Sequence, residues 1–231
     1  MVDQPEGIAW LEGRVGVAQG ARHKQVESPT GTEREQPVTP VLEEDRARLA
    51  IDAEGVGKSF GSTPVLRDLS LQVRQGEIFG LIGPSGSGKS TTVHILCSHL
   101  RPDTGTVRVL GEEPLAFTEQ TRERIGYMPQ GFILQRDLTV RQNVSFAAGL
   151  YGIWEWRSKQ KIRRVLDLVE LWEARNRPAR DISGGMQRRL ALAAALVHDP
   201  EILFADEPTA NLDPILRAKL WDHFRGMSNQ G

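Results

Sequence analysis

The order of apolar and polar residues divides the chain into two parts. Up to about Leu49 the apolar residues follow no sustained period of 2 or 3.6, and glycine, proline, glutamine and glutamate are frequent. From Ala50 onward, short apolar runs are separated by glycine-containing turns, which is the pattern of β-strands. We therefore predict a disordered or linker-like extension over residues 1–49 and a folded domain over residues 50–231.

Strands and helices are expected to alternate within this domain. Strands are predicted at the apolar runs LAIDAEGV, PVLRDLSLQV, EIFGLIG, GTVRVLG and EILFA. Most of the remaining sequence from residue 138 onward has a helical pattern, and the T-x-x-Q capping box of Thr139 and Gln142 predicts a helix that begins at Val140. Such alternation is typical of α/β proteins with a parallel sheet.

The composition is that of a globular protein, with 39% hydrophobic and 26% charged residues. A net charge of -1 gives no general attraction to polyanions, and we expect no nucleic-acid partner. The longest apolar run, residues 190–197, is far shorter than the roughly 18 residues of a membrane-spanning helix. The acidic start lacks a secretion signal, so we expect a cytoplasmic protein in which Cys97 is a buried hydrophobe without a redox role.

Residues 83–90, GPSGSGKS, fit the phosphate-loop pattern G-x-x-x-x-G-K-[ST] between a predicted strand and a predicted helix. The glycines allow backbone N–H groups to converge on a phosphate, and the helix N-terminus adds partial positive charge. Lys89 supplies a full charge there, and Ser90 offers a hydroxyl to a Mg²⁺ ion that bridges two phosphates. The other nucleotide contacts predicted in this loop are Gly83, Pro84, Ser85, Gly86, Ser87, Gly88 and Thr91.

The apolar run EILFA is followed by two carboxylates. Asp206 would hold Mg²⁺, and Glu207 would polarise the water that attacks the γ-phosphate. Adjacent acids at a strand end also occur as ordinary surface charge. The phosphate loop in the same chain favours the functional interpretation.

A third motif, DISGGMQRRL, begins with a residue suited to cap a helix, Ser183, followed by Gly184 and Gly185, which leave the helix N-terminus open to an anion. With the phosphate loop before it and the two acids after it, this order resembles the nucleotide-binding subunit of ATP-binding cassette (ABC) transporters, whose signature reads L-S-G-G-Q. The resemblance covers about residues 50–231. The sequence S-G-G-M followed by basic residues is similar to the drug-export and lipid-export branch.

The resemblance implies further site residues. Phe60 matches the aromatic residue that stacks on adenine, and Asp213 belongs to the D-loop, which crosses the dimer interface. Gln130 matches the Q-loop glutamine, which senses Mg²⁺ and the attacking water and whose loop faces the membrane partner. The implied catalytic residues are then Glu207, Lys89 and Gln130, and the implied metal ligands are Ser90, Gln130 and Asp206.

The resemblance also implies an architecture and a role. The fold would be a P-loop NTPase core with a mostly parallel sheet, an N-terminal antiparallel β subdomain and a helical subdomain inserted at about residues 125–185. The protein would bind and hydrolyse MgATP as a homodimer or tandem cassette, with each ATP between the phosphate loop of one subunit and Ser183 of the other. It would power export through an integral membrane permease from the cytoplasmic face of the membrane.

Two departures from the family pattern are visible. Met186 stands where glutamine is usual, but the phosphate contacts would come from Ser183 and the glycines. No switch histidine follows Glu207 at the expected interval, because the sequence ends at Gly231, and His223 is interpreted as an ordinary helix residue. We therefore expect a C-terminally truncated chain that lacks a central strand beside the phosphate-loop strand and is poorly folded and inactive alone. The alternatives are a non-transport ABC ATPase and a nucleotide-binding fragment without hydrolysis.

Overall fold

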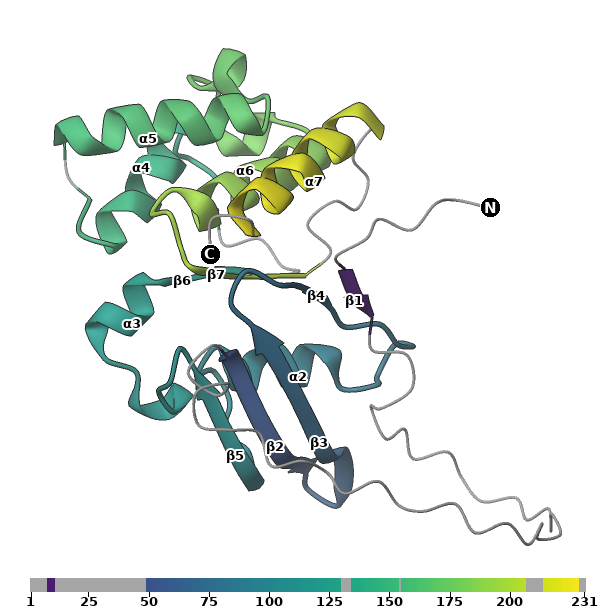
Figure 1. The fold of residues 1–231 in the computed structure, drawn as a ribbon. Coiled ribbons are helices and arrows are strands. Elements are labelled where there is room, and N and C mark those ends of the chain that lie inside the picture. Colours follow the sequence, from purple (N-terminus) through teal and green to yellow (C-terminus); the bar gives the residue numbers. More distant parts are fainter. Residues whose placement is uncertain (1–7, 11–48, 130–133, 154, 207–213, 229–231) are drawn as a thin grey trace, which may run out of the picture.

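The computed structural model describes residues 8–10, 49–129, 134–153, 155–206 and 214–228. Its elements form a lower lobe, which holds a β-sheet and a helix, and an upper lobe of helices, with a pair of short strands between them (Figure 1). The lower lobe contains strands β2 (Leu49–Phe60), β3 (Thr63–Arg74) and β5 (Thr104–Val109) and helix α2 (Lys89–Leu96). The upper lobe contains α4 (Val140–Leu150), α5 (Glu155–Leu168), α6 (Gly184–Leu196) and α7 (Pro214–Ser228).

The lower lobe is built on an antiparallel sheet with the order β3-β2-β5. Along β3 the buried residues Leu69, Leu71 and Val73 alternate with exposed ones, which is the period of two that the sequence shows. Ile95 of α2 and Val109 of β5 belong to the same apolar core. The predicted N-terminal antiparallel β subdomain is thereby confirmed.

The remaining strands pair in parallel. Strand β6 (Ile125–Met128) runs beside β7 (Ile202–Ala205), and β1 (Ile8–Trp10) runs beside β4 (Ile78–Gly80), the strand that leads into the phosphate loop. Among the described residues, β4 and β7 fall in separate ladders. The mixed α/β class is therefore confirmed. The aperiodic sequence of residues 1–49 did not predict β1.

The upper lobe has its own apolar core. Val140, Val144 and Ala148 recur every four residues on α4 and are completely buried, as are Leu190 and Leu192 of α6. Short 3-10 turns at Trp172–Ala174 and Ala179–Asp181 connect α5 to α6, while η1 (Pro114–Ala116) and α3 (Glu119–Glu123) precede β6. The helical subdomain is expected at about residues 125–185. The first part of this range forms strand β6, and the helices of the upper lobe begin only after it.

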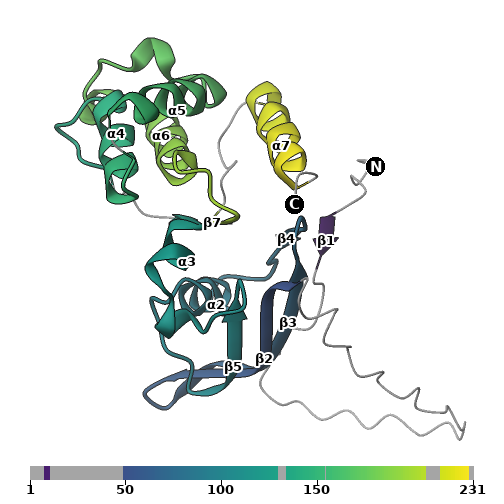
Figure 2. The ribbon, with the colours of Figure 1, turned by 60° about the vertical axis from the view of Figure 1, so that its left-hand side comes forward.

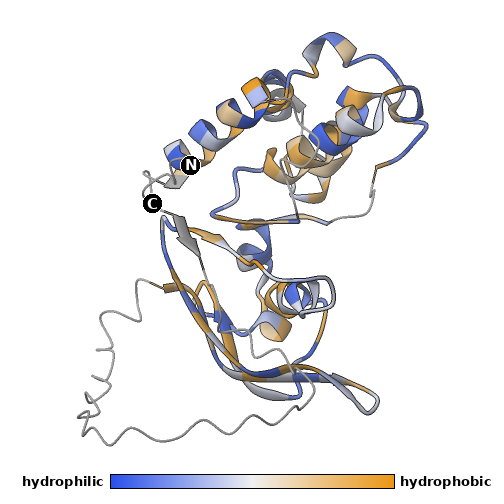
Figure 3. Cartoon of the chain, turned by 90° about the vertical axis from the view of Figure 1, so that its right-hand side faces the viewer, coloured by the Kyte–Doolittle hydropathy of each residue, from blue (hydrophilic) through white to orange (hydrophobic). Residues whose placement is uncertain are grey.

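The capping box predicted at the start of α4 is confirmed. The Thr139 hydroxyl accepts a hydrogen bond from the Gln142 N–H at 3.2 Å, and the Gln142 side-chain carbonyl accepts one from the Thr139 N–H at 2.9 Å. Hydrophobic and hydrophilic residues alternate along the helices rather than forming continuous apolar cylinders (Figure 3). Within the described ranges, no helix combines the length and the apolar character that crossing a bilayer would require.

Two single residues agree with their sequence interpretation. Cys97 caps the C-terminus of α2 and is half-buried rather than fully buried; it packs against the lower core, where desolvation raises the pKa of its thiol to about 12. A thiol that stays protonated is a poor nucleophile, so a structural role is supported. His223 is half-buried on α7 beside Phe224, and burial lowers its pKa, as expected for a packing histidine.

Candidate nucleotide-binding site

The predicted phosphate loop lies between β4 and the N-terminus of α2. The Lys89 ammonium group donates hydrogen bonds to the carbonyl oxygens of Gly83 and Pro84, at 2.7 and 2.8 Å, and lies 3.5 Å from the Ser87 hydroxyl. The loop therefore curls around its own cation. The N-cap of α2 is Gly88, which has no side chain to satisfy the first N–H groups, and the first turn of this helix carries no acidic residue. Both features suit a bound phosphate.

Gly88 is required by the backbone and by its surroundings. Its φ is +90°, in the left-handed region, and a Cβ placed there would lie 2.5 Å from a Leu66 methyl carbon and 3.3 Å from the Val65 carbonyl oxygen. The glycine therefore lets α2 begin directly against β3. No other residue type combines this backbone conformation with so close an approach.

Gly88→Ala is expected to lower the free energy of unfolding by about 2 kcal/mol or more, because left-handed strain and overpacking add. The measurement is denaturant unfolding of the purified chain. Gly226→Ala is the matched control, since an added Cβ there meets nothing within 4 Å, and helix propensity favours alanine by about 1 kcal/mol. Equal stabilities for the two variants would contradict the role given to Gly88.

Phe60 lies at the end of β2 with 52% of its surface exposed, so its side chain is accessible from solvent, as a residue that stacks on a base must be. The Lys58 ammonium is 5.8 Å from the ring centroid and 2.7 Å from an Asp103 carboxylate oxygen. This hydrogen bond from Lys58 lowers the pKa of Asp103, so the carboxylate stays ionised and holds Lys58 near the ring. Lys58 was not singled out from the sequence, although its two-residue spacing from Phe60 on a strand would have indicated it.

Asp206 is the first of the two acids that follow the apolar run EILFA, and it is the last described residue before the gap at 207–213. Its N–H donates to the Met128 carbonyl oxygen at 3.0 Å, and its own carbonyl oxygen accepts a hydrogen bond from Arg188 at 3.0 Å. Arg188 comes from α6, so the helix of the S-G-G-M motif braces the end of β7. No pattern in the sequence indicates this contact, because it depends on how α6 crosses the strands.

Ser183 caps α6 as expected. Its hydroxyl accepts the Met186 N–H at 3.3 Å, and the first turn of the helix contains no acid. Ser183 and Gly184 are exposed, and Gly185 is half-buried. This helix N-terminus therefore presents N–H groups to solvent in the upper lobe, whereas that of α2 belongs to the lower lobe (Figure 2).

The structure describes only part of the predicted site. The phosphate-loop residues Gly83 to Thr91 form one loop and helix start, and Asp206 directly follows β7. Gln130, Glu207 and Asp213 lie outside the described residues. The roles assigned to all of these residues stay predictions.

Comparison with known proteins gives one family. Residues 66–210 match the family model described as "ABC transporter". A solved structure, described as "Structure of ATP binding subunit of ABC transporter", superposes with a TM-score of 0.72 and 25% sequence identity, over 79% of this chain and 76% of that chain. The matched range contains both the phosphate loop and Ser183.

Three curated relatives are bacterial. A Nod factor export ATP-binding protein I of Sinorhizobium fredii is 39% identical over 80% of this chain and 54% of its own length. A probable multidrug ABC transporter ATP-binding protein of Escherichia coli is 37% identical over 89% of this chain and 35% of its own length. A daunorubicin resistance ATP-binding protein of Streptomyces coeruleorubidus is 38% identical over 80% of this chain and 58% of its own length. The chain thus spans between about a third and three fifths of the length of these relatives.

Proposed function

Because this chain belongs to the ABC transporter family, we propose that it binds and hydrolyses MgATP as a dimer and thereby powers export through a membrane permease. The observation that carries the proposal is the Lys89 ammonium enclosed by its loop at the acid-free N-terminus of α2. A cation beside N–H groups that no side chain caps matches the β- and γ-phosphates of a nucleotide.

The donor set fits Mg²⁺. Ser90 is exposed in the first turn of α2 and carries a hydroxyl group. Asp206 is half-buried directly after β7 and carries a carboxylate. These are the two positions at which the sequence predicts metal ligands. Oxygen donors of this kind are those that Mg²⁺ prefers. The ion would neutralise charge on the β- and γ-phosphates. Lys89 would orient the phosphates, and Gln130 and Glu207 are the residues proposed to position the attacking water.

A dimer is supported by the placement of the two helix N-termini. Those of α2 and α6 are both free of acids but belong to different lobes of one chain (Figure 2). Two phosphate-binding helix ends on separate lobes can meet at one ATP when a second subunit supplies one of them. We therefore propose that Ser183, Gly184 and Gly185 of one subunit bind the ATP held by Lys89 of the other, with Asp213 near the interface.

Phe60→Ala is expected to weaken ATP and ADP binding alike, by roughly 1–2 kcal/mol, because stacking acts on the base and not on the phosphates. Calorimetric titration of the chain with each nucleotide and Mg²⁺ measures this, and the parent titration is also the direct test of nucleotide binding. Leu115→Ala is the control, since Leu115 is about equally exposed, at 50%, on η1. A loss confined to ATP would contradict the stacking role.

Export is the direction proposed for transport. The relatives described above are named for Nod factor export, multidrug transport and daunorubicin resistance, and the S-G-G-M motif agrees with that branch. Contact with a permease is supported by Phe146 and Leu150, which lie one turn apart on α4 and are 50% and 71% exposed. The proposed location is accordingly the cytoplasmic face of a membrane.

Residues 1–231 alone are expected to turn over ATP slowly or not at all. In the described part of the chain, β4 pairs with β1 and β7 pairs with β6, so no backbone ladder fixes the phosphate loop relative to Asp206. Catalysis needs both within a fraction of an ångström of their working positions. A phosphate-release assay of the chain with Mg-ATP tests this expectation. A turnover number of about 1 per second or more, typical of enzymes, would refute it.

A further inference from the structure

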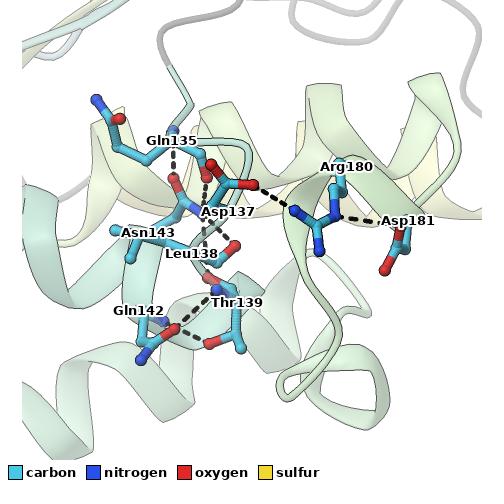
Figure 4. A network of polar contacts seen from close by, with 8 residues as sticks. All are labelled: Gln135, Asp137, Leu138, Thr139, Gln142, Asn143, Arg180 and Asp181. Carbon is cyan, nitrogen blue, oxygen red and sulfur yellow. Dashed lines mark hydrogen bonds and ion pairs between the residues drawn. The ribbon is translucent and has the colours of Figure 1, made fainter.

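Residues 135–139, a few positions after the predicted Q-loop glutamine, fold around one buried amide group. Asn143 of α4 is 4% exposed, and residues 135–139 wrap around it (Figure 4). Its side-chain oxygen accepts the Gln135 N–H at 2.8 Å, and its side-chain nitrogen donates to the carbonyl oxygens of Gln135, Leu138 and Thr139 at 3.0–3.1 Å. Because a short side-chain amide both donates and accepts, it fixes the shape of the whole segment.

The same segment is joined to the stretch that leads into α6. Four backbone hydrogen bonds of 2.9–3.0 Å connect them, from Ala179 to Leu138, from Arg180 to Arg136, from Val140 to Arg177 and from Arg141 to Arg175. An isolated β-bridge between Thr139 and Pro178 lies among these bonds. The two stretches are therefore held together by backbone hydrogen bonds, although about forty positions separate them in the sequence.

The stretch is in turn attached to the first turns of α6. The Gln187 side-chain nitrogen donates to the Ala179 carbonyl oxygen at 2.8 Å, and the Ser183 hydroxyl caps the helix. A continuous set of hydrogen bonds thus runs from Gln135, five positions after Gln130, to Ser183. Gln130 and Ser183 are the residues proposed to act on the ATP of opposite subunits.

One ion pair spans the two stretches on the outside. The Arg180 guanidinium binds the Asp137 carboxylate and lies 3.8 Å from that of Asp181. The Arg180 side chain is 54% exposed and that of Asp137 is 85% exposed, and exposed pairs contribute little to stability. The pair can therefore be altered without unfolding the lobe, unlike the buried Asn143.

We propose that Asp137 and Arg180 form a latch that makes residues 135–139 and the approach to Ser183 move as one unit. The proposal rests on the proposed function, since it concerns communication between the two parts of the same ATP site. Asp137 and Arg180 are positioning residues and touch no nucleotide. Their alteration should change how often the assembled site reaches its working geometry, while leaving the phosphate loop able to bind ATP.

The experiment reverses the two charges, one at a time and together, in a version of the protein that hydrolyses ATP. Asp137→Arg and Arg180→Asp should each lower kcat for ATP hydrolysis about fivefold or more, while KM for ATP stays within about twofold. The double reversal should restore at least about half of the parent kcat, because the attraction is re-formed with exchanged signs. Asp222→Arg, which breaks the similarly exposed pair with Arg225 on α7, is the matched control and should leave kcat unchanged.

The latch would be overturned by single reversals whose kcat matches that of the control, or by a double reversal no faster than the single ones. A loss caused only by misfolding would lower the thermal midpoint in parallel with kcat, and it too would overturn the proposal. Lys89→Ala is measured alongside and reports on the proposed function. If that variant binds ATP like the parent, the nucleotide site is wrongly assigned; if it does not, while the reversals behave like the control, only the latch fails.

Discussion

Lys89→Ala is expected to abolish measurable ATP binding, with an affinity loss of about 100-fold or more. The substitution removes the side-chain cation from the loop, and charge-assisted hydrogen bonds to phosphate contribute about 1.5–3 kcal/mol each. It also removes the two hydrogen bonds by which Lys89 holds the carbonyl groups of Gly83 and Pro84. The loop would then lose both its charge and its internal brace. Titration of the purified variant with Mg-ATP measures the change.

The control for this prediction is a lysine with no part in the loop. Lys219 on α7 pairs with the exposed Glu170, so Lys219→Ala removes one positive charge far from the phosphate loop along the chain. Its ATP affinity should stay within about twofold of the parent, because exposed ion pairs matter little beyond their own surroundings. An unchanged affinity in Lys89→Ala, or an equal loss in both variants, would refute the assignment of Lys89.

The parts of the fold that could be predicted well from the sequence are those encoded by neighbouring residues. The capping box at Thr139, the helix cap at Ser183 and the phosphate loop depend on side chains and glycines within a few positions of one another. Alternating burial in β3 follows from a period of two that is visible in the sequence. Local chemistry is sufficient in each of these cases.

The features that could not be predicted depend on distant partners. Strand β1 exists through its pairing with β4, and three residues without periodicity cannot indicate a strand. Arg188 is one of several basic residues after the S-G-G-M motif, and its role is visible only when α6 is placed against β7. Asn143 looks like an exposed helix residue in the sequence, whereas in the fold the loop before α4 closes around it. Each case needs the tertiary arrangement, which patterns along one chain do not contain.

Glu207→Gln, made in a version of the protein that hydrolyses ATP, is expected to lower turnover by about 10²- to 10⁴-fold, the range of general-base catalysis. Glutamine keeps the volume of the side chain but removes the charge that would polarise the attacking water. ATP binding should persist, because the cation and the N–H groups of the phosphate loop are unchanged. Since reopening of the dimer is expected to follow hydrolysis, the ATP-bound dimer should accumulate.

Two measurements check this expectation, phosphate release for turnover and sizing chromatography with Mg-ATP for the dimer. Glu201→Gln supplies the control at the opposite end of the same strand, where the exposed Glu201 carboxylate pairs with Arg124 at 2.6 Å. That variant should hydrolyse ATP within about twofold of the parent rate, since loss of an exposed pair has small effects. A Glu207→Gln protein that dimerises no more than its parent would show that this carboxylate does not activate the water. An equal loss of turnover in both variants would instead point to damage of β7 as a whole, because the two carboxylates flank that strand in the sequence.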